Sequence, residues 1–203
     1  MGAATSLPNL LSQQQSHDAT SPPYYIMMGL SGAGKTAILD RLKIGLYIAH
    51  HPSISENIET IDYMSKRGQR VFNLWDITER GDRGLRVYES WRTLSQQYPQ
   101  GIIFVVDSTD HSHLSMELAA ERLSTVLREG VEDLTLLPLL VLANKQDSRY
   151  AMTVADVKDM LGLEELPQEQ VWHIQGVSAK WGEGLMEGFD WLLEHSDLGV
   201  VRE

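Results

Sequence analysis

The arrangement of apolar residues along the chain constrains the fold more than any other feature. From residue 24 onward, apolar runs of strand length alternate with amphipathic stretches of helix length, which is typical of a parallel sheet with helices on both faces. The apolar runs are 24–29, 57–64, 70–76, 101–107, 137–145 and 171–177; the helical stretches are 35–48, 87–98, 114–129, 153–161 and 185–194. We therefore predict an α/β domain with about six mostly parallel strands, in which 57–64 and 70–76 form an antiparallel edge hairpin.

Length and composition favour a single domain. A chain of 203 residues with 42% hydrophobic content can bury one sizeable core. Residues 1–23 are rich in Ser, Gln and Pro, so we expect a flexible arm there. The predicted domain spans 24–197, and 198–203 form a short tail. The chain has no cysteine, which excludes disulfides and thiolate metal sites and suits a reducing cytoplasm.

The charge of the chain excludes some classes of partner. The formal net charge is −11, which argues against a nucleic-acid surface and against purely electrostatic attachment to anionic lipid. No apolar stretch approaches the about 18 residues that a membrane span needs. No Lys or Arg precedes Lys35, so a signal peptide is not expected.

Residues 29–36, Gly-Leu-Ser-Gly-Ala-Gly-Lys-Thr, fit the pattern G-x-x-x-x-G-K-[ST] between a predicted strand and a predicted helix. Glycines allow the backbone N–H groups to surround a β-phosphate, and the helix that follows presents its positive end to the anion. Lys35 would reach the β- and γ-phosphates, and the Thr36 hydroxyl would bind Mg²⁺. The predicted phosphate-binding residues are Gly29, Ser31, Gly32, Ala33, Gly34, Lys35 and Thr36.

A second polar motif predicts which base is bound. Residues 144–147, Asn-Lys-Gln-Asp, follow an apolar strand directly. A carboxylate at Asp147 can accept hydrogen bonds from the ring N–H and the exocyclic amine of guanine, whereas adenine offers an acceptor at the first position. Alone, this motif could be a polar turn. The predicted guanine-binding residues are Asn144, Lys145, Asp147, Ser178, Ala179 and Lys180, with Lys145 over the base and a backbone N–H of the last three facing the guanine carbonyl.

Together these motifs resemble the Arf and Arf-like family of small GTPases. GLSGAGKT, IIFVVDSTD, LANKQD, WHIQ and GLMEGFDWL match the family pattern in order, over roughly residues 24–193. The resemblance implies a P-loop NTPase G domain that binds GTP, GDP and Mg²⁺. It also implies exchange factors, activating proteins and effectors as partners, a role in membrane trafficking or organelle signalling, and a cytoplasmic protein that can lie peripherally on Golgi or other endomembranes.

The amino terminus begins Met-Gly-Ala-Ala-Thr-Ser, which fits the myristoylation pattern M-G-x-x-x-[ST] at Gly2. A single myristoyl chain binds membranes only marginally, and stable anchoring needs a second signal. The arm contains no Lys, Arg or Cys to supply that signal. We therefore expect weak and reversible membrane contact at most.

The two switch regions depart from the family pattern. Asp76, which would hold a metal-bound water, is followed by Thr78, Glu79 and Arg80, where the family has glycine, glycine and a water-orienting glutamine. Ser53 stands at the family's Mg²⁺-binding threonine and keeps a hydroxyl. These departures predict slow intrinsic GTP hydrolysis. The loop that follows Asp76 is also longer than the family pattern, and we call it the extended loop. Two alternatives stay open: a catalytic residue elsewhere in the extended loop, or a nucleotide-locked scaffold without turnover.

A P-loop kinase or ATPase is disfavoured by residues 144–147 and by the lack of an arginine-rich lid. The histidine pairs at 50–51 and 111/113 lack a third ligand, so we predict no metal site there. Trp75, Trp91 and Tyr88 either face an exposed groove beside the switches, as the resemblance implies, or pack between sheet and helix.

Overall fold

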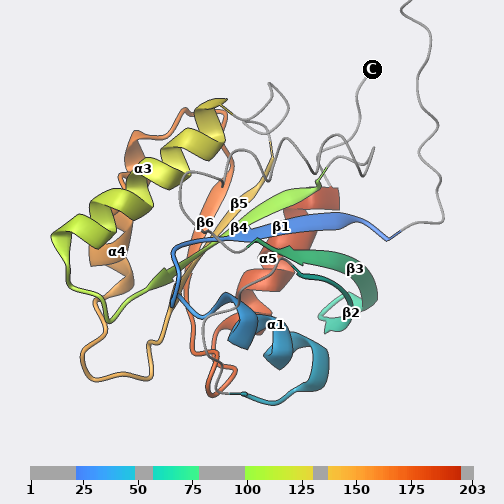
Figure 1. The fold of residues 1–203 in the computed structure, drawn as a ribbon. Coiled ribbons are helices and arrows are strands. Elements are labelled where there is room, and N and C mark those ends of the chain that lie inside the picture. The colour runs from blue at the N-terminus through green and yellow to red at the C-terminus, as the bar shows by residue number, and fades with distance from the viewer. Residues whose placement is uncertain (1–21, 49–56, 78–98, 130–136, 198–203) are drawn as a thin grey trace, which may run out of the picture.

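The computed structural model describes residues 22–48, 57–77, 99–129 and 137–197, and it confirms the predicted α/β architecture (Figure 1). The six strands are β1 (Tyr24–Met28), β2 (Asn57–Ser65), β3 (Gly68–Asp76), β4 (Gly101–Asp107), β5 (Leu139–Asn144) and β6 (Trp172–Gly176). They form one sheet in the order β2-β3-β1-β4-β5-β6. All neighbouring strands are parallel except β2 and β3, which pair antiparallel at the edge.

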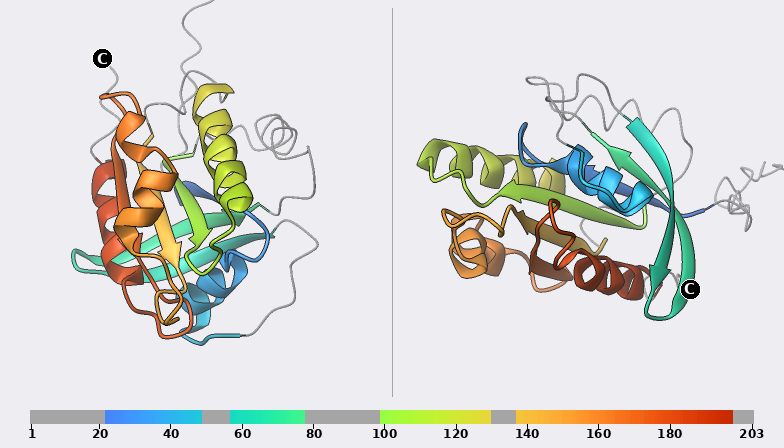
Figure 2. Two further views of the ribbon diagram at one scale, coloured as in Figure 1. Left: turned by 90° about the vertical axis from the view of Figure 1, so that its left-hand side faces the viewer. Right: turned by 90° about the horizontal axis from the view of Figure 1, so that it is seen from below.

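Helices cover both faces of the sheet and bury two hydrophobic clusters (Figure 2). The helices are α1 (Lys35–Ile44), α3 (His113–Glu129), α4 (Val154–Met160) and α5 (Leu185–Asp197), with a short 3₁₀ turn, η3 (Leu163–Glu165). One cluster joins the sheet to α3 and α4, and the other joins it to α1 and α5. β5 is buried throughout and β4 is buried up to its last residue, Asp107, which explains why both appear in the sequence as continuous apolar runs. No helix in the described part of the chain is long and apolar enough to cross a membrane.

The edge hairpin is longer and tighter than the sequence predicted. β2 and β3 pair along their whole length up to Ser65 and Gly68, so only Lys66 and Arg67 form the turn. Gly68 has a φ of 112°, and the Ser65 hydroxyl donates to its carbonyl at 2.7 Å. A two-residue turn needs a positive φ nearby, and glycine provides it without strain.

Helix ends also differ from the predicted ranges. α1 ends at Ile44, four residues before the predicted end, because Gly45 adopts a left-handed conformation with a φ of 71° and caps the helix. α5 continues to Asp197, beyond the predicted end at residue 194. The helix predicted over 87–98 lies outside the described residues, as do most of the predicted arm (1–21) and the tail (198–203).

Of the two alternatives for Trp75, packing between sheet and helix is confirmed and exposure in a groove is wrong. Its side chain is only 6% exposed and packs in the cluster beneath α3, with Ile77 and Phe104. Trp75 lies on β3 next to the central strand β1, opposite Ile26, where the sheet is covered and a large apolar ring gains most by burial. Trp91 and Tyr88 lie outside the described residues.

Aromatic rings and a buried carboxylate attach the hairpin to α5. Phe72 on β3 stacks on Phe189 of α5, with ring centroids 6.1 Å apart, and Tyr63 on β2 lies beside both rings. The Tyr63 hydroxyl lies 3.1 Å from the Met186 carbonyl and 3.2 Å from Asp190 Oδ1. Burial, and then the charge of Asp190, raises the pKa of Tyr63 well above its ordinary value, so the hydroxyl keeps its proton.

Replacing Tyr63 with phenylalanine should lower the free energy of unfolding by about 2 kcal/mol. Asp190 is only 5% exposed, and without the hydroxyl the one partner its carboxylate would retain in the described part of the chain is the distant Lys66 ammonium, 3.9 Å away. Urea unfolding measures the change. The control is Tyr150→Phe, because the Tyr150 side chain is exposed. Equal stability of the two variants would show that the Tyr63 hydroxyl does not stabilise the hairpin.

Candidate functional site

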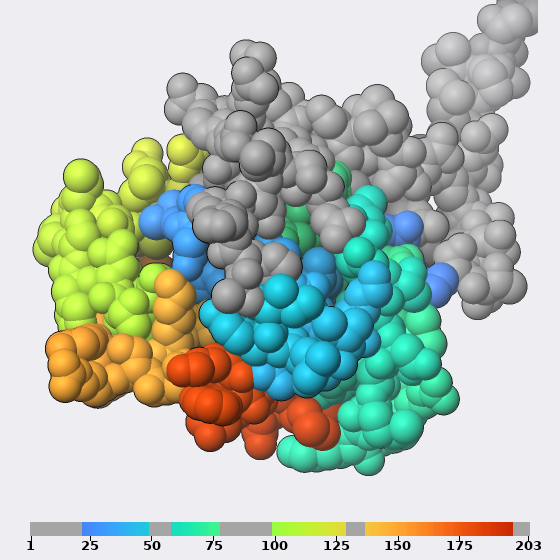
Figure 3. All heavy atoms as spheres, turned by 60° about the horizontal axis from the view of Figure 1, so that its bottom comes forward, coloured from blue at the N-terminus to red at the C-terminus, as the bar shows by residue number. Residues whose placement is uncertain are grey.

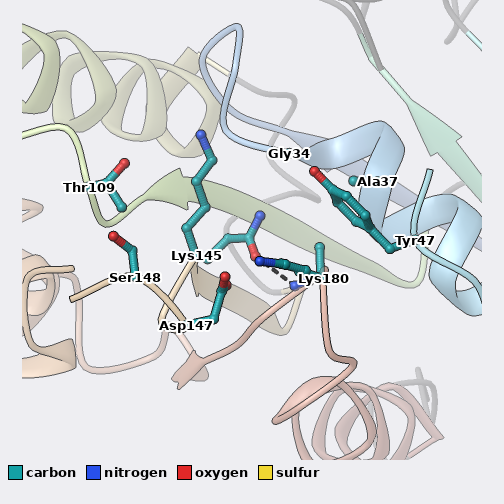
Figure 4. A pocket seen from close by; sticks show the side chains of 10 residues that line it. Gly34, Ala37, Tyr47, Thr109, Lys145, Asp147, Ser148 and Lys180 are labelled. Carbon is teal, nitrogen blue, oxygen red and sulfur yellow. Dashed lines mark hydrogen bonds between the residues drawn. The ribbon is translucent and has the colours of Figure 1, made fainter. Parts of the chain in front are cut away.

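The predicted motifs meet at the carboxyl ends of β1, β4, β5 and β6, where ligands bind in open α/β sheets. A cavity of about 290 Å³ opens there. The described residues that line it are Gly34, Ala37, Tyr47, Thr109, Asn144, Lys145, Asp147, Ser148, Ala179 and Lys180. Figure 4 shows Lys145 and Asp147 on one side of this cavity and Tyr47 across from them.

Two glycines of the phosphate loop have no room for a side chain. Gly29 has a φ of 139°, and a Cβ there would lie 2.1 Å from the Val105 carbonyl oxygen. Gly34 has a φ of 97°, and a Cβ there would lie 2.3 Å from Asn144 Nδ2. Both positions combine a left-handed backbone with close approach to a neighbouring strand, so only glycine fits. The loop between them, including Ser31, Gly32 and Ala33, is thereby held against β4 and β5.

Two of the predicted metal-binding residues, Thr36 and Asp76, lie together beside this loop. The Thr36 hydroxyl donates to Asp76 Oδ2 at 2.8 Å, and Asp76 is only 1% exposed. Its other oxygen, Oδ1, is buried and accepts no hydrogen bond from the described residues. Burial raises the pKa of Asp76, while the Thr36 hydroxyl and the Lys35 charge act in the opposite direction. A buried carboxylate with one oxygen unsatisfied suits a hydrated cation, so the residues present fit Mg²⁺.

Lys35 is folded back on its own loop. Its ammonium donates to the Gly29 carbonyl at 2.6 Å and to the Leu30 carbonyl at 3.2 Å, and the side chain is buried. A buried ammonium needs such acceptors or an anion in their place. These contacts keep the Lys35 side chain at the edge of the loop, where the predicted phosphate would bind.

Asn144 joins the phosphate loop to both base loops. Its side-chain amide donates to the Ala33 carbonyl at 2.8 Å, and its oxygen accepts from the Ala179 N–H at 3.0 Å. All three groups are buried, and Asn144 is 1% exposed. This connection uses the Ala179 N–H, one of the three backbone N–H groups predicted to face the guanine carbonyl. The dashed line in Figure 4 marks this contact.

Asp147 is exposed to the cavity and is held by the Ser178 hydroxyl. The Ser178 hydroxyl donates to Asp147 Oδ1 at 2.8 Å, and the Trp181 N–H donates to the Ser178 hydroxyl at 3.1 Å. The carboxylate is thus oriented while most of its acceptor capacity faces the cavity. Lys180 lies on the same side, with its ammonium 4.9 Å from the centre of the Trp181 ring.

Several residues of the site, among them Asp107 and Tyr47, were not identified from the sequence. Asp107, at the end of β4, forms an ion pair with the Lys145 ammonium and accepts from the Thr109 N–H at 2.9 Å. Its position after an apolar strand, like that of Asp76, is the signal that could have revealed it. Tyr47 lines the cavity from the segment after α1, and no pattern in the sequence marks it.

Other predicted site residues fall elsewhere. Gly2, Ser53, Thr78, Glu79 and Arg80 lie outside the described residues, and their roles stay predictions. The His111 Nε2–H donates to the Tyr150 carbonyl at 2.6 Å, and His113 lies 3.1 Å from Glu117. Over the described ranges no group of three or more His, Cys, Asp or Glu side chains could hold a metal ion.

Comparison with known proteins agrees with this geometry. Residues 10–196 match the model of the ADP-ribosylation factor family. The fold is similar to that of the Arl6 BBS3 small GTPase from Trypanosoma brucei, whose structure contains the bound nucleotide analogue GppNp. The two chains are 26% identical with a TM-score of 0.69, and the alignment covers 88% of this chain and 99% of the other. The match over most of its length and the small-GTPase fold show that the chain belongs to the ADP-ribosylation factor family.

Proposed function

We propose that this chain is a guanine-nucleotide switch that binds GTP and GDP with Mg²⁺. The observation that carries the proposal is the position of Asn144, which ties the phosphate loop at Ala33 to the loop at Ala179. Asp147 opens into the same cavity. A phosphate site and a guanine site are thereby held at a fixed separation, which is what a nucleoside phosphate requires.

The phosphates would be held by the loop from Gly29 to Thr36. Its backbone N–H groups surround the β-phosphate, α1 presents its positive end, and the Lys35 ammonium exchanges its backbone acceptors for phosphate oxygens. Thr36 would bind Mg²⁺ together with Ser53, and Asp76 would accept from a metal-bound water. Mg²⁺ would neutralise charge on the β- and γ-phosphates.

The base would be selected by the Asp147 carboxylate. Guanine presents a ring N–H and an exocyclic amine to it, and both are donors. Adenine presents a ring nitrogen acceptor at the first of these positions, which would repel the carboxylate. Displacement of a fluorescent GDP analogue from the purified protein tests this choice. We expect unlabelled GDP to compete and ADP to compete at least about a hundredfold more weakly; equal competition would instead support an ATP-using P-loop enzyme.

We further propose that hydrolysis is slow. In related switches, orienting the water and supplying an arginine together contribute about 10⁵-fold to the rate, and the sequence after Asp76 lacks the glutamine that orients the water. A single-turnover assay on GTP-loaded protein should therefore give a rate below that of a family member with this glutamine. A comparable rate would mean that another residue of the extended loop, such as Arg80, Arg83 or Glu79, takes its place.

The same sequence departure favours a second candidate, a nucleotide-locked scaffold that binds partners without turnover. No hydrolysis over many hours, with GTP still bound, would support it over a slow enzyme. In either case we propose exchange factors, activating proteins and effectors as partners. We also propose weak, reversible contact with Golgi or other endomembranes through a myristoylated Gly2.

A further inference from the structure

Arg41 of α1 reaches the loop after β6 from outside the cavity. Its Nε donates to the Ala179 carbonyl at 3.1 Å, and its Nη2 donates to the Lys180 carbonyl. Both carbonyls belong to the loop that lines the cavity, whereas Arg41 is not among the described lining residues. In Figure 3 the surface of α1 adjoins the surface of the segment just before α5.

The guanidinium is also held at the end of its own helix. Its Nη1 donates to the Gly45 carbonyl at 2.7 Å, while the Gly45 N–H donates to the Arg41 carbonyl at 3.0 Å. A cation at the C-terminal end of a helix is favoured by the helix dipole. Gly182 lies close to the aliphatic part of the Arg41 side chain: a Cβ added to Gly182 would be 3.5 Å from Arg41 Cδ. Arg41 is thus fixed before any ligand binds.

The contact with the Ala179 carbonyl determines where the next N–H points. The Ala179 carbonyl and the Lys180 N–H belong to one planar trans peptide unit, so they point in opposite directions. The Ala179 N–H is already used by Asn144, whereas the Lys180 N–H makes no hydrogen bond with the described residues. A charged donor on the carbonyl also polarises the unit and strengthens its N–H as a donor.

We propose that Arg41 is a positioning residue that aims the Lys180 N–H at the 6-carbonyl of a bound guanine. The proposal rests on the proposed guanine-nucleotide function and adds to it a residue remote from the ligand. Arg41 acts through the peptide unit and does not touch the base. Loss of Arg41 therefore weakens one contact to guanine, the one at the 6-carbonyl, and leaves the contacts of Asp147 unchanged.

The test compares the affinities of wild type and Arg41→Ala for GDP and for two GDP analogues, each measured by calorimetric titration. The analogue 6-thio-GDP replaces the carbonyl oxygen with sulfur, a weak acceptor, and keeps both donors to Asp147. We expect wild type to bind it about tenfold more weakly than GDP. Arg41→Ala should bind GDP about tenfold more weakly than wild type, and it should discriminate between GDP and 6-thio-GDP by less than about twofold.

Two controls separate this role from general destabilisation. IDP lacks the exocyclic amine that Asp147 binds, so its loss of affinity relative to GDP should be the same in wild type and Arg41→Ala. The matched variant is Arg128→Ala on α3, whose guanidinium contacts, among the described residues, only the Ser124 carbonyl of its own helix. Arg128→Ala should bind all three nucleotides like wild type.

The outcomes distinguish this inference from the proposed function. If wild type does not bind GDP, the proposed function fails and this inference fails with it. If wild type binds GDP but Arg41→Ala keeps the full penalty for 6-thio-GDP, only the role of Arg41 is overturned. If Arg41→Ala does not fold, the same affinities are measured for Arg41→Lys instead. A single ammonium cannot bind both carbonyls in the fork geometry, so an intermediate sulfur penalty is expected.

Discussion

Replacing Asp147 with asparagine should weaken GDP binding by about a hundredfold and allow xanthosine diphosphate to bind in its place. The carboxylate accepts from two donors on guanine, and an amide at this position turns one acceptor into a donor. Xanthine carries an oxygen where guanine carries the exocyclic amine, so the new N–H meets an acceptor. Ser178 would retain its hydrogen bond to the remaining oxygen, which keeps the side chain in place.

Competition against a fluorescent GDP analogue measures both the loss of affinity for GDP and the gain of affinity for xanthosine diphosphate. The matched control is Asp159→Asn, which changes the same charge on α4, where the side chain is exposed and remote from the cavity. That control should prefer GDP as wild type does. If Asp147→Asn still preferred GDP to xanthosine diphosphate, the carboxylate would not be reading the base.

Removing the side chain of Asn144 should have the second large effect. Asn144→Ala leaves the buried Ala33 carbonyl and the buried Ala179 N–H without the hydrogen bonds that Asn144 gives them. Two such losses should lower the free energy of unfolding by about 3 kcal/mol. The loops would no longer be held at a fixed separation, so nucleotide release should be faster by at least about tenfold. Urea unfolding and stopped-flow release of a fluorescent nucleotide measure the two effects.

Asn73→Ala separates these effects. Asn73 on β3 is 8% exposed, and its side-chain oxygen accepts from the Thr60 hydroxyl at 2.8 Å. It is an asparagine of similar burial that does not line the cavity, so its removal should cost stability without changing the release rate. Faster release from Asn73→Ala as well would show that Asn144 acts only through overall stability.

The sheet and the two binding loops were predictable because each is encoded locally. Strands such as β4 and β5 are buried on both faces, and their continuous apolar runs reveal them. The phosphate loop and the loop at residues 144–147 are contiguous motifs placed directly after strands. Their meeting at one edge of the sheet follows from the parallel order of the strands.

What could not be predicted depends on contacts between distant residues. Leu46, Tyr47 and Ile48 continue the apolar pattern of α1, but Gly45 ends the helix and leaves all three exposed. The pairing of β3 with β1 buries Trp75, and an exposed aromatic residue would have looked the same in the sequence. Arg41 lies 138 residues from the carbonyl that it binds, and no local pattern indicates such a partner.

The central claim is that this cavity binds a guanine nucleotide, and its most direct test is the identity of the nucleotide that accompanies the purified protein. The protein is denatured without added nucleotide, and the released compound is identified by chromatography. We expect a guanine nucleotide, and GTP in preference to GDP because hydrolysis is expected to be slow. An adenine nucleotide, or no nucleotide at all, would contradict it.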